Sequence, residues 1–340
     1  MMNKWISKMQ AGQALSETES FLCLKTLFNA DESGESALQL LRAVSSSSEN
    51  TDTIVGFCKA IQDEMIRVQL PEDTIDVCGT GGSGKVRFNT STAAAFICAS
   101  MGINVAKHGN RGSKEANGSF DFLEALGIPF GQNPDHLEQI IKDQHLCFIF
   151  ARQHHPQLAK FADARKTIGT RTIFNLIGPL CNPGNLNYQV IGTTNLETAE
   201  TMAEARQRLG TKKTIFVVGA NGLDELSTTG PSTLITVTPD KIETHTFNPE
   251  NIGFKKRQES EIEGGSSIEN ATHFLHLLEH RNVTDPIAEL IVLNAGLAHY
   301  CIGKSSSIKA GVDAAISAIQ TGQAANYYDS YKDYVRTRLR

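Results

Sequence analysis

Residues 75–106 read IDVCGTGGSGKVRFNTSTAAAFICASMGINVA. Residues 75–78 form a short apolar run that leads directly into glycines, residues 93–99 favour a helix, and residues 103–106 form a second short run. The alternation continues, with expected strands at 146–150, 190–191 and 214–218 and expected helices at 122–126 and 197–208. Strands that alternate with helices predict an α/β fold with a central, mainly parallel sheet and helices on its faces.

The first 70 residues have a different pattern, which predicts a small α-helical lobe. Ser16 and Glu19 form a capping box at the start of one helix, and Ile54, Cys58 and Ile61 recur at helical spacing in another. We expect residues 1–70, joined by a later segment near 170–190, to form this lobe. Residues 71–340 then form the larger α/β domain, with the active site in the cleft between the two.

Composition and charge describe an ordinary soluble protein of 340 residues, 40% of them hydrophobic and 20% charged, with a formal net charge of −5. A weakly acidic surface repels nucleic acid and anionic membranes, so neither is an expected partner. The seven cysteines are scattered and never spaced as C-x-x-C, which argues against a disulfide framework or a zinc site. The N-terminal residues open no apolar run long enough for a signal peptide or a membrane span, so we expect a reduced, cytoplasmic environment.

The glycine loop at residues 79–85, GTGGSGK, follows an expected strand and precedes a helix that begins near Asn89. Glycines let backbone N–H groups approach a phosphate closely, and the helix N-terminus adds free donors. The loop also fits the first part of a P-loop, but Val86 stands where a P-loop needs Ser or Thr to bind magnesium. A phosphate-binding loop of another kind is therefore favoured over a nucleotide hydrolase and over a purely structural turn.

Four motifs follow one another along the chain: GTGG at 79–82, FNTST at 88–92, KHGNR at 107–111 and GLDE at 222–225. Together with Arg165 and the stretch RTIFNLIGPL at 171–180, they resemble the anthranilate phosphoribosyltransferases, whose pattern is G-T-G-G-D, T-F-N-I-S-T, K-H-G-N-R and D-G-L-D-E. The resemblance runs from about residue 73 to the C-terminal helices, and the helical lobe fits in position and length. It implies a two-lobed fold like that of nucleoside phosphorylases and phosphoribosyltransferases, and a homodimer through the helical lobe.

By this resemblance the chain transfers the phosphoribosyl group of phosphoribosyl pyrophosphate (PRPP) to the amine of anthranilate, with Mg²⁺, in tryptophan biosynthesis. The resemblance also implies three groups of site residues. The expected PRPP contacts are Gly79, Gly82, Ser83, Arg87, Asn89, Thr90, Ser91, Thr92, Lys107 and Ser119; the anthranilate contacts are Gly79, His108, Asn110 and Arg165; and the metal ligands are Ser91, Asp224 and Glu225.

The expected reaction needs these residue types. PRPP is a dense polyanion, so its transfer depends on positioning and electrostatics, with a metal that neutralises the leaving pyrophosphate. Mg²⁺ takes one or two carboxylates together with substrate phosphate, which suits Asp224 and Glu225. Arg165 can hold the anthranilate carboxylate with a bidentate fork. We see no Ser-His-Asp or Cys-His arrangement for a covalent nucleophile, and His108 is a candidate acceptor for the amine proton.

Departures from the family pattern cluster in the donor site. Ser83 replaces an Asp, Arg87 replaces a Thr, Lys114 and Glu115 replace two Ser, and Asn221 begins the last motif in place of Asp. Three interpretations follow: Glu115 pairs with Arg87 or Lys85 and PRPP still binds, the donor or acceptor is changed, or catalysis is lost. The intact acceptor residues and metal pair favour the first.

Other functions stay open at this point. The enzymatic alternatives are a related phosphoribosyltransferase and a pyrimidine nucleoside phosphorylase with a similar fold. The alternative of another class is a non-catalytic paralogue that binds a ligand or nucleic acid. Arg165 with Asn110 favours an aromatic carboxylate over a pyrimidine as the acceptor.

Overall fold

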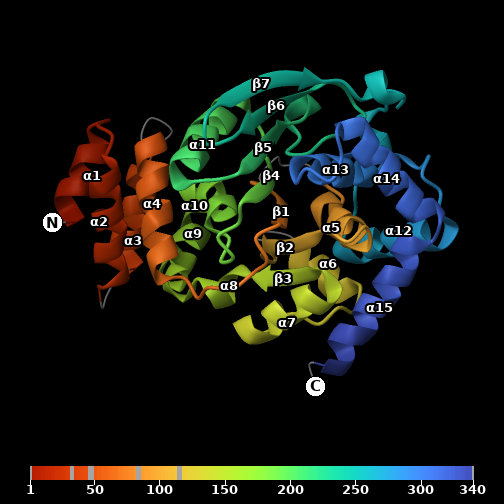
Figure 1. Cartoon of the computed structure of the whole chain (residues 1–340). Coiled ribbons are helices and arrows are strands. Elements are labelled where there is room, and N and C mark those ends of the chain that lie inside the picture. The colour runs from red at the N-terminus through yellow and green to blue at the C-terminus, as the bar shows by residue number, and fades with distance from the viewer. Residues whose placement is uncertain (1, 31–33, 45–49, 82–85, 113–116, 339–340) are drawn as a thin grey trace.

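The computed structural model describes residues 2–30, 34–44, 50–81, 86–112 and 117–338. Within these ranges a central sheet lies between two groups of helices (Figure 1). The N-terminal helices stand at one end of the molecule, and the C-terminal helices lie on the opposite side. The predicted α/β fold is confirmed.

The described residues form one seven-stranded sheet in the order β3-β2-β1-β4-β5-β6-β7. Strands β1 to β5 pair in parallel, and β6 and β7 add antiparallel to β5 at one edge. The chain moves outward from β1 through β2 and β3 and then returns to place β4 on the other side of β1, which makes a topological switch point where α/β proteins bind ligands. The strands span Thr74–Gly79 (β1), Asn104–Gly109 (β2), Leu146–Phe150 (β3), Tyr188–Gly192 (β4), Lys213–Val218 (β5), Ser232–Val237 (β6) and Ile242–Phe247 (β7).

Helices α1 to α4 form the N-terminal group, and the predicted capping box opens α2. The Ser16 hydroxyl accepts a hydrogen bond from the Glu19 N–H at 3.2 Å, and the Glu19 carboxylate accepts one from the Ser16 N–H at 3.0 Å. Later helices join this group, because α9 contacts α3 and α10 contacts α4. The division of the chain into lobes near residue 70 stays a prediction. These elements span Met2–Gln10 (α1), Glu17–Phe28 (α2), Gly34–Ala43 (α3), Thr51–Glu64 (α4), Ala151–His154 (α8), Pro156–Phe161 (η1), Ala162–Ile168 (α9), Ile173–Ile177 (α10) and Gly178–Cys181 (η2).

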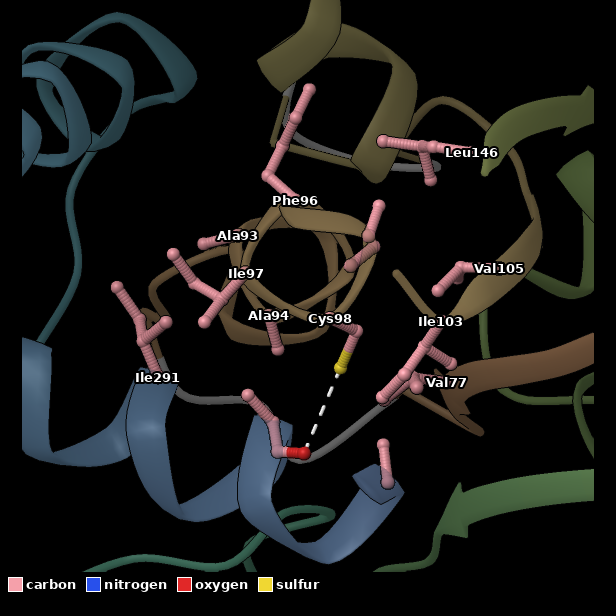
Figure 2. Packing of buried hydrophobic residues seen from close by; sticks show 14 of the residues in the cluster. Val77, Ala93, Ala94, Phe96, Ile97, Cys98, Ile103, Val105, Leu146 and Ile291 are labelled. Carbon is pink, nitrogen blue, oxygen red and sulfur yellow. Dashed lines mark hydrogen bonds between the residues drawn. The ribbon is translucent and has the colours of Figure 1, made fainter. Parts of the chain in front are cut away.

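The remaining helices cover the sheet, and α5 is the most enclosed of them. All of its residues except Ser91 are buried, and its alanines let it lie close to the sheet and to α13. Figure 2 shows its side chains packed between Ile291 of α13 and the strand residue Val77, and the Cys98 thiol donates to the Ala295 carbonyl at 3.6 Å. These elements span Thr90–Ser100 (α5), Ser119–Ala125 (α6), Pro134–Gln144 (α7), Leu196–Leu209 (α11), Ala220–Gly222 (η3), Pro249–Ile252 (η4), Glu259–Glu261 (η5), Ser267–His280 (α12), Pro286–Cys301 (α13), Ile308–Gln320 (α14) and Gln323–Arg338 (α15).

The seven cysteines are free thiols, and all except the half-buried Cys78 are buried. Burial raises the pKa of Cys23, Cys98 and Cys301 to about 12. These thiols therefore stay protonated at neutral pH. Among the described helices, none is both long enough and apolar enough to cross a membrane.

Candidate active site

A cavity of about 730 Å³ lies at the switch point, at the carboxyl ends of β1, β2, β4 and β5. It brings together segments that are far apart in sequence, from β1 to α13. Gly82, Ser83, Lys114 and Glu115 lie outside the described residues. The predicted site residues that line it are Gly79, Arg87, Asn89, Thr90, Ser91, Thr92, Lys107, His108, Asn110, Ser119, Asp224 and Glu225.

Two glycines on neighbouring strands leave the space that the Asp224 loop occupies, which we call the Asp224 seat. Gly79 of β1 pairs with Gly192 of β4 in the sheet register, and both stand at the ends of their strands. A Cβ atom at Gly79 would lie 2.6 Å from Asp224 Oδ2, and one at Gly192 would lie 1.6 Å from the Asp224 carbonyl oxygen. Only glycine at both positions leaves room for the Asp224 loop to lie flat against the sheet. Sequence reasoning assigned Gly79 to substrate and missed Gly192 altogether.

Arg87 forms an ion pair with Asp224, between Nη1 and Oδ1. The second carboxylate oxygen, Oδ2, accepts a hydrogen bond from the Gly81 N–H at 2.7 Å. The Arg87 and Asp224 side chains are only 16% and 9% exposed, so solvent screens this pair weakly. Nε and Nη2 of Arg87 are buried and have no hydrogen-bond partner among the described residues. The arginine therefore keeps two unused donors, covered by neighbouring atoms, in the wall of a cavity predicted to bind phosphate.

Glu225, the neighbour of Asp224, is half-buried and also lines the cavity. Burial raises the pKa of this carboxyl, while the charge of Arg87 opposes that shift. In turn, burial lowers the pKa of Arg87, and Glu225 opposes that shift. The two carboxylates and the arginine thus form one electrostatic unit.

Two asparagines hold the backbone of Arg87, and a third, Asn89, is hydrogen-bonded to one of them. The Arg87 carbonyl accepts hydrogen bonds from Asn117 Nδ2 at 2.9 Å and from Asn270 Nδ2 at 3.0 Å. Asn270 Nδ2 also reaches Asn89 Oδ1 at 2.9 Å, which ties the start of α5 to the start of α12. Sequence reasoning gave neither Asn117 nor Asn270 a role, since an isolated asparagine gives no signal of its partners.

Lys107 is buried in the sheet floor, where its position is fixed. Its ammonium donates to the Val77 carbonyl at 2.7 Å and to the Ser91 hydroxyl at 3.0 Å. Asp76, which sequence reasoning missed, is fully buried in the same layer and accepts from Asn182 Nδ2 at 3.0 Å. Burial lowers the pKa of Lys107 and raises the pKa of Asp76, and each charge opposes the shift of the other. Asp76 therefore helps Lys107 to remain a cation inside the protein.

His108, which lines the cavity, packs against a second buried histidine, His155. The rings of His108 and His155 meet edge to face with their centroids 5.2 Å apart. Burial lowers the pKa of His108 well below its ordinary value and the pKa of His155 to about 4. Both rings are therefore neutral at pH 7, and a neutral imidazole can accept a proton or a hydrogen bond.

Arg165 does not stand among the described residues that line the cavity. It belongs to α9, where its guanidinium lies 5.8 Å from the centroid of the Phe174 ring. Arg165 is thus the one predicted acceptor residue among the described ones that does not line the cavity with Gly79, His108 and Asn110. Asn110 does line the cavity, and its carbonyl accepts from the Ser119 hydroxyl at 3.2 Å.

The donor atoms suit Mg²⁺ as a substrate-bound ion. Within the described residues, no group of three or more His, Cys, Asp or Glu side chains is arranged to hold a metal alone. Two carboxylates and the Ser91 hydroxyl line the cavity, and Mg²⁺ commonly binds to one or two carboxylates with phosphate oxygens completing its shell. The residues fit Mg²⁺ that arrives with a diphosphate.

Comparisons with known proteins agree with this geometry. A family model described as "Glycosyl transferase family, a/b domain" matches residues 71–325. The anthranilate phosphoribosyltransferase of Geobacillus stearothermophilus is 36% identical over 319 residues, which are 94% of each chain. That of Rubrobacter xylanophilus is 37% identical over 326 residues, 95% of this chain and 94% of the relative.

Solved structures give the same result. The anthranilate phosphoribosyltransferase of Thermus thermophilus superimposes with a TM-score of 0.89 at 33% identity, over 97% of this chain and 99% of that one. The Saccharomyces cerevisiae enzyme in complex with PRPP and Mg superimposes with a TM-score of 0.88 at 25% identity, over 99% and 98%. The resemblance inferred from the four motifs is confirmed, and the chain belongs to the glycosyl transferase family and, within it, to the anthranilate phosphoribosyltransferases.

Proposed function

We propose that this protein transfers the phosphoribosyl group of PRPP to the amine of anthranilate, giving phosphoribosyl-anthranilate and pyrophosphate, in tryptophan biosynthesis. The observation that carries the proposal is the cavity at the β1/β4 switch point, where Lys107, Arg87 and the hydroxyls of α5 meet the Asp224–Glu225 pair. Related structures hold PRPP with Mg in one case and 4-fluoroanthranilate in another. The family assignment and this site favour the transferase over a nucleoside phosphorylase or a non-catalytic paralogue.

The donor half of the reaction is electrostatic. Lys107 and Arg87 face the phosphates as cations, and the start of α5 offers backbone N–H groups and the hydroxyls of Thr90, Ser91 and Thr92. Asp224 and Glu225 would hold Mg²⁺ there, and the ion would neutralise charge on the departing pyrophosphate. Positive charge develops on the ribose as pyrophosphate leaves, so the site must limit attack by water.

The acceptor half lies beside His108 and Asn110. Neutral His108 can accept a hydrogen bond or the proton that the amine loses once it is bonded to ribose. The aniline nitrogen is already largely unprotonated at neutral pH, so it needs no strong base before it attacks. Arg165 would grip the anthranilate carboxylate after α9 moves toward the cavity, a closure common in enzymes that exclude water.

Two further expectations belong to this proposal. The N-terminal helices carry an exposed apolar side chain, Leu22 at 46% exposure, which suits their use as a homodimer surface. The absence of C-x-x-C pairs and the buried, protonated thiols suit a cytoplasmic enzyme. Sedimentation of the purified chain at micromolar concentration tests the dimer.

The decisive experiment is an assay of purified protein with anthranilate, PRPP and Mg²⁺, followed by the loss of anthranilate fluorescence. We expect turnover that EDTA abolishes and added Mg²⁺ restores. Thymidine with inorganic phosphate, tested in parallel, should give no phosphorolysis. Phosphorolysis of thymidine without turnover of anthranilate would replace the proposal by the phosphorylase, and binding of PRPP without any turnover would leave a paralogue.

A further inference from the structure

Arg87 occupies a position in which it competes with the metal. Its Nη1 is paired with Oδ1 of Asp224, and the Gly81 N–H occupies Oδ2. Both oxygens of the first metal carboxylate are therefore engaged within the protein. The family motif has a threonine at this position, which carries no charge to place there.

The backbone of Arg87 is anchored, so its side chain alone can move. Asn117 and Asn270 hold its carbonyl, and the residue forms an antiparallel bridge with Glu263. A Cβ atom at Gly264 would lie 2.1 Å from the Arg87 carbonyl carbon, which shows how tightly the two segments pack. Release of Asp224 must therefore come from rotation of the guanidinium about the side-chain bonds, with the loop in place.

The two unused donors of the Arg87 guanidinium suit a phosphate. Nε and Nη2 are buried in the cavity wall with no hydrogen-bond partner among the described residues. This pair of donors is the edge with which arginine binds phosphate in a bidentate fork. A guanidinium and Mg²⁺ repel one another at the same carboxylate, whereas a diphosphate attracts both.

We propose that Arg87 is an internal counter-cation that holds Asp224 away from metal until a diphosphate draws the guanidinium onto its phosphate oxygens. The inference rests on the proposed function in one respect, because the diphosphate is taken to be that of the donor. Its consequence is an order of binding: the diphosphate frees the carboxylate, and the metal enters with it. The donor-free protein accordingly binds divalent metal weakly.

Two binding measurements on the full chain test the proposal, with Arg87→Thr as the principal variant. Electron paramagnetic resonance measures Mn²⁺ binding to the protein without any phosphate compound. Calorimetry measures binding of inorganic pyrophosphate in EDTA, without metal. We expect Arg87→Thr to bind Mn²⁺ at least tenfold more tightly and metal-free pyrophosphate at least tenfold more weakly than the natural protein. Opposite shifts are the signature, since a structural defect would weaken both.

The control is Arg111→Thr, which removes the same charge from the same cavity. Arg111 lines the cavity but pairs with Asp121 and Glu124, so Asp224 stays occupied in this variant. Its Mn²⁺ affinity should change less than threefold. An equal gain in Arg111→Thr would mean that overall charge governs metal binding, and no gain in Arg87→Thr would mean that Arg87 does not compete; either result overturns the proposal.

Two more variants keep the test decisive if Arg87→Thr is poorly folded. Arg87→Lys keeps the charge without the fork, so Mn²⁺ binding should stay weak while metal-free pyrophosphate affinity falls. Asp224→Asn frees the arginine, so it should bind metal-free pyrophosphate more tightly than the natural protein. Weaker binding by Asp224→Asn contradicts the proposal. Neither measurement uses anthranilate, so a protein that fails to turn over anthranilate can still show these shifts, and an active enzyme can lack them.

Discussion

At the scale of single residues, the site depends on two glycines, whose lack of a Cβ atom matters as much as the charged side chains. Gly79 was predicted from sequence as a phosphate contact, on the argument that a Cβ atom would block the ligand. The structure adds a second cause, because Gly79 and Gly192 leave space for the Asp224 loop. Gly192 could not be predicted, since its neighbour on β1 is 113 positions earlier in the chain and only the sheet register pairs them.

Gly192→Ala is expected to disable the metal carboxylate. The new Cβ would lie 1.6 Å from the Asp224 carbonyl oxygen, so the Asp224 loop must shift by about an ångström or more. A displacement of that size costs about 100-fold in rate when it moves a reacting group. We expect kcat/KM for PRPP to fall by about two orders of magnitude, as measured by steady-state kinetics. Gly34→Ala, at a helical glycine with nothing within 4 Å, serves as the control, and equal kinetics in the two variants would contradict the account of the seat.

Arg165→Ala is expected to weaken the binding of anthranilate and to leave the binding of PRPP unchanged. The residue lies outside the cavity wall on α9, so its loss should leave the PRPP site unchanged. Loss of a charged, bidentate partner costs about 2–5 kcal/mol, which is a KM for anthranilate at least 30-fold higher with the KM for PRPP within threefold. The nearby arginine Arg152, replaced in the same way, should change either KM much less. A rise in both KM values for Arg165→Ala would instead indicate a structural role.

At the scale of elements, the alternation of short strands and helices predicted most of the sheet. The expected strands at 146–150, 190–191 and 214–218 correspond to β3, β4 and β5, and the expected helix at 197–208 to α11. The antiparallel hairpin of β6 and β7 was missed. β7 is exposed along most of its length and reads IETHTF, so it has no buried face to produce a hydrophobic pattern. An edge strand is specified by its neighbour more than by its own residues.

The close contact between α13 and α14 depends on two glycines. These helices pack closely because Gly311 faces Gly296, and a Cβ atom at Gly311 would lie 2.3 Å from the Gly296 carbonyl oxygen. Gly311→Ala should therefore lower the free energy of unfolding by about 1–3 kcal/mol or more, as overpacked cores do. Urea denaturation measures this, again with Gly34→Ala as the control. A stable Gly311→Ala protein would mean that the two helices can separate at no cost.

At the scale of the whole molecule, twelve of the residues predicted from the family resemblance line one cavity. Composition or periodicity alone could not have predicted that these residues come together. The resemblance could not supply the partner of Arg87, because that residue departs from the family pattern. The sequence suggested that Glu115 pairs with Arg87 or Lys85, and Glu115 and Lys85 lie outside the described residues. Among the described residues Arg87 pairs with Asp224, a contact between positions 137 residues apart.

The stability of the whole chain should fall in mild acid because of the buried histidines. His155 has an ordinary pKa of 6.5 and a folded pKa of about 4, and His108 is shifted in the same direction. Above pH 6.5 these rings are neutral in both states. As the pH falls from 6.5 toward 4, the unfolded chain binds protons that the folded chain does not, so stability falls by up to about 1.4 kcal/mol per pH unit for each ring.

Urea denaturation at pH 7 and at pH 5 measures this loss. His155→Gln should reduce the difference between the two pH values by roughly 2 kcal/mol. The pKa of His273 is shifted in the opposite direction, because the hydrogen bond to Asp285 raises the pKa of its ring. That interaction contributes stability below the ordinary pKa, so His273→Gln should make the acid loss steeper. A His155→Gln protein with an unchanged pH difference would show that this ring is protonated in the folded state.

Alkylation of the buried thiols can report how often the chain unfolds. Six of the seven cysteines are buried, with Cys98, Cys147 and Cys301 in one hydrophobic core and Cys23, Cys58 and Cys181 in another. A thiol hidden from solvent reacts slowly with an alkylating reagent. Each passage through the unfolded state exposes all of them at once, so a molecule should go from unmodified to fully modified with few intermediates. The mass spectrum of a labelled sample would then count, molecule by molecule, how many chains had opened, and partial labelling confined to one core would reveal that one half of the protein opens alone.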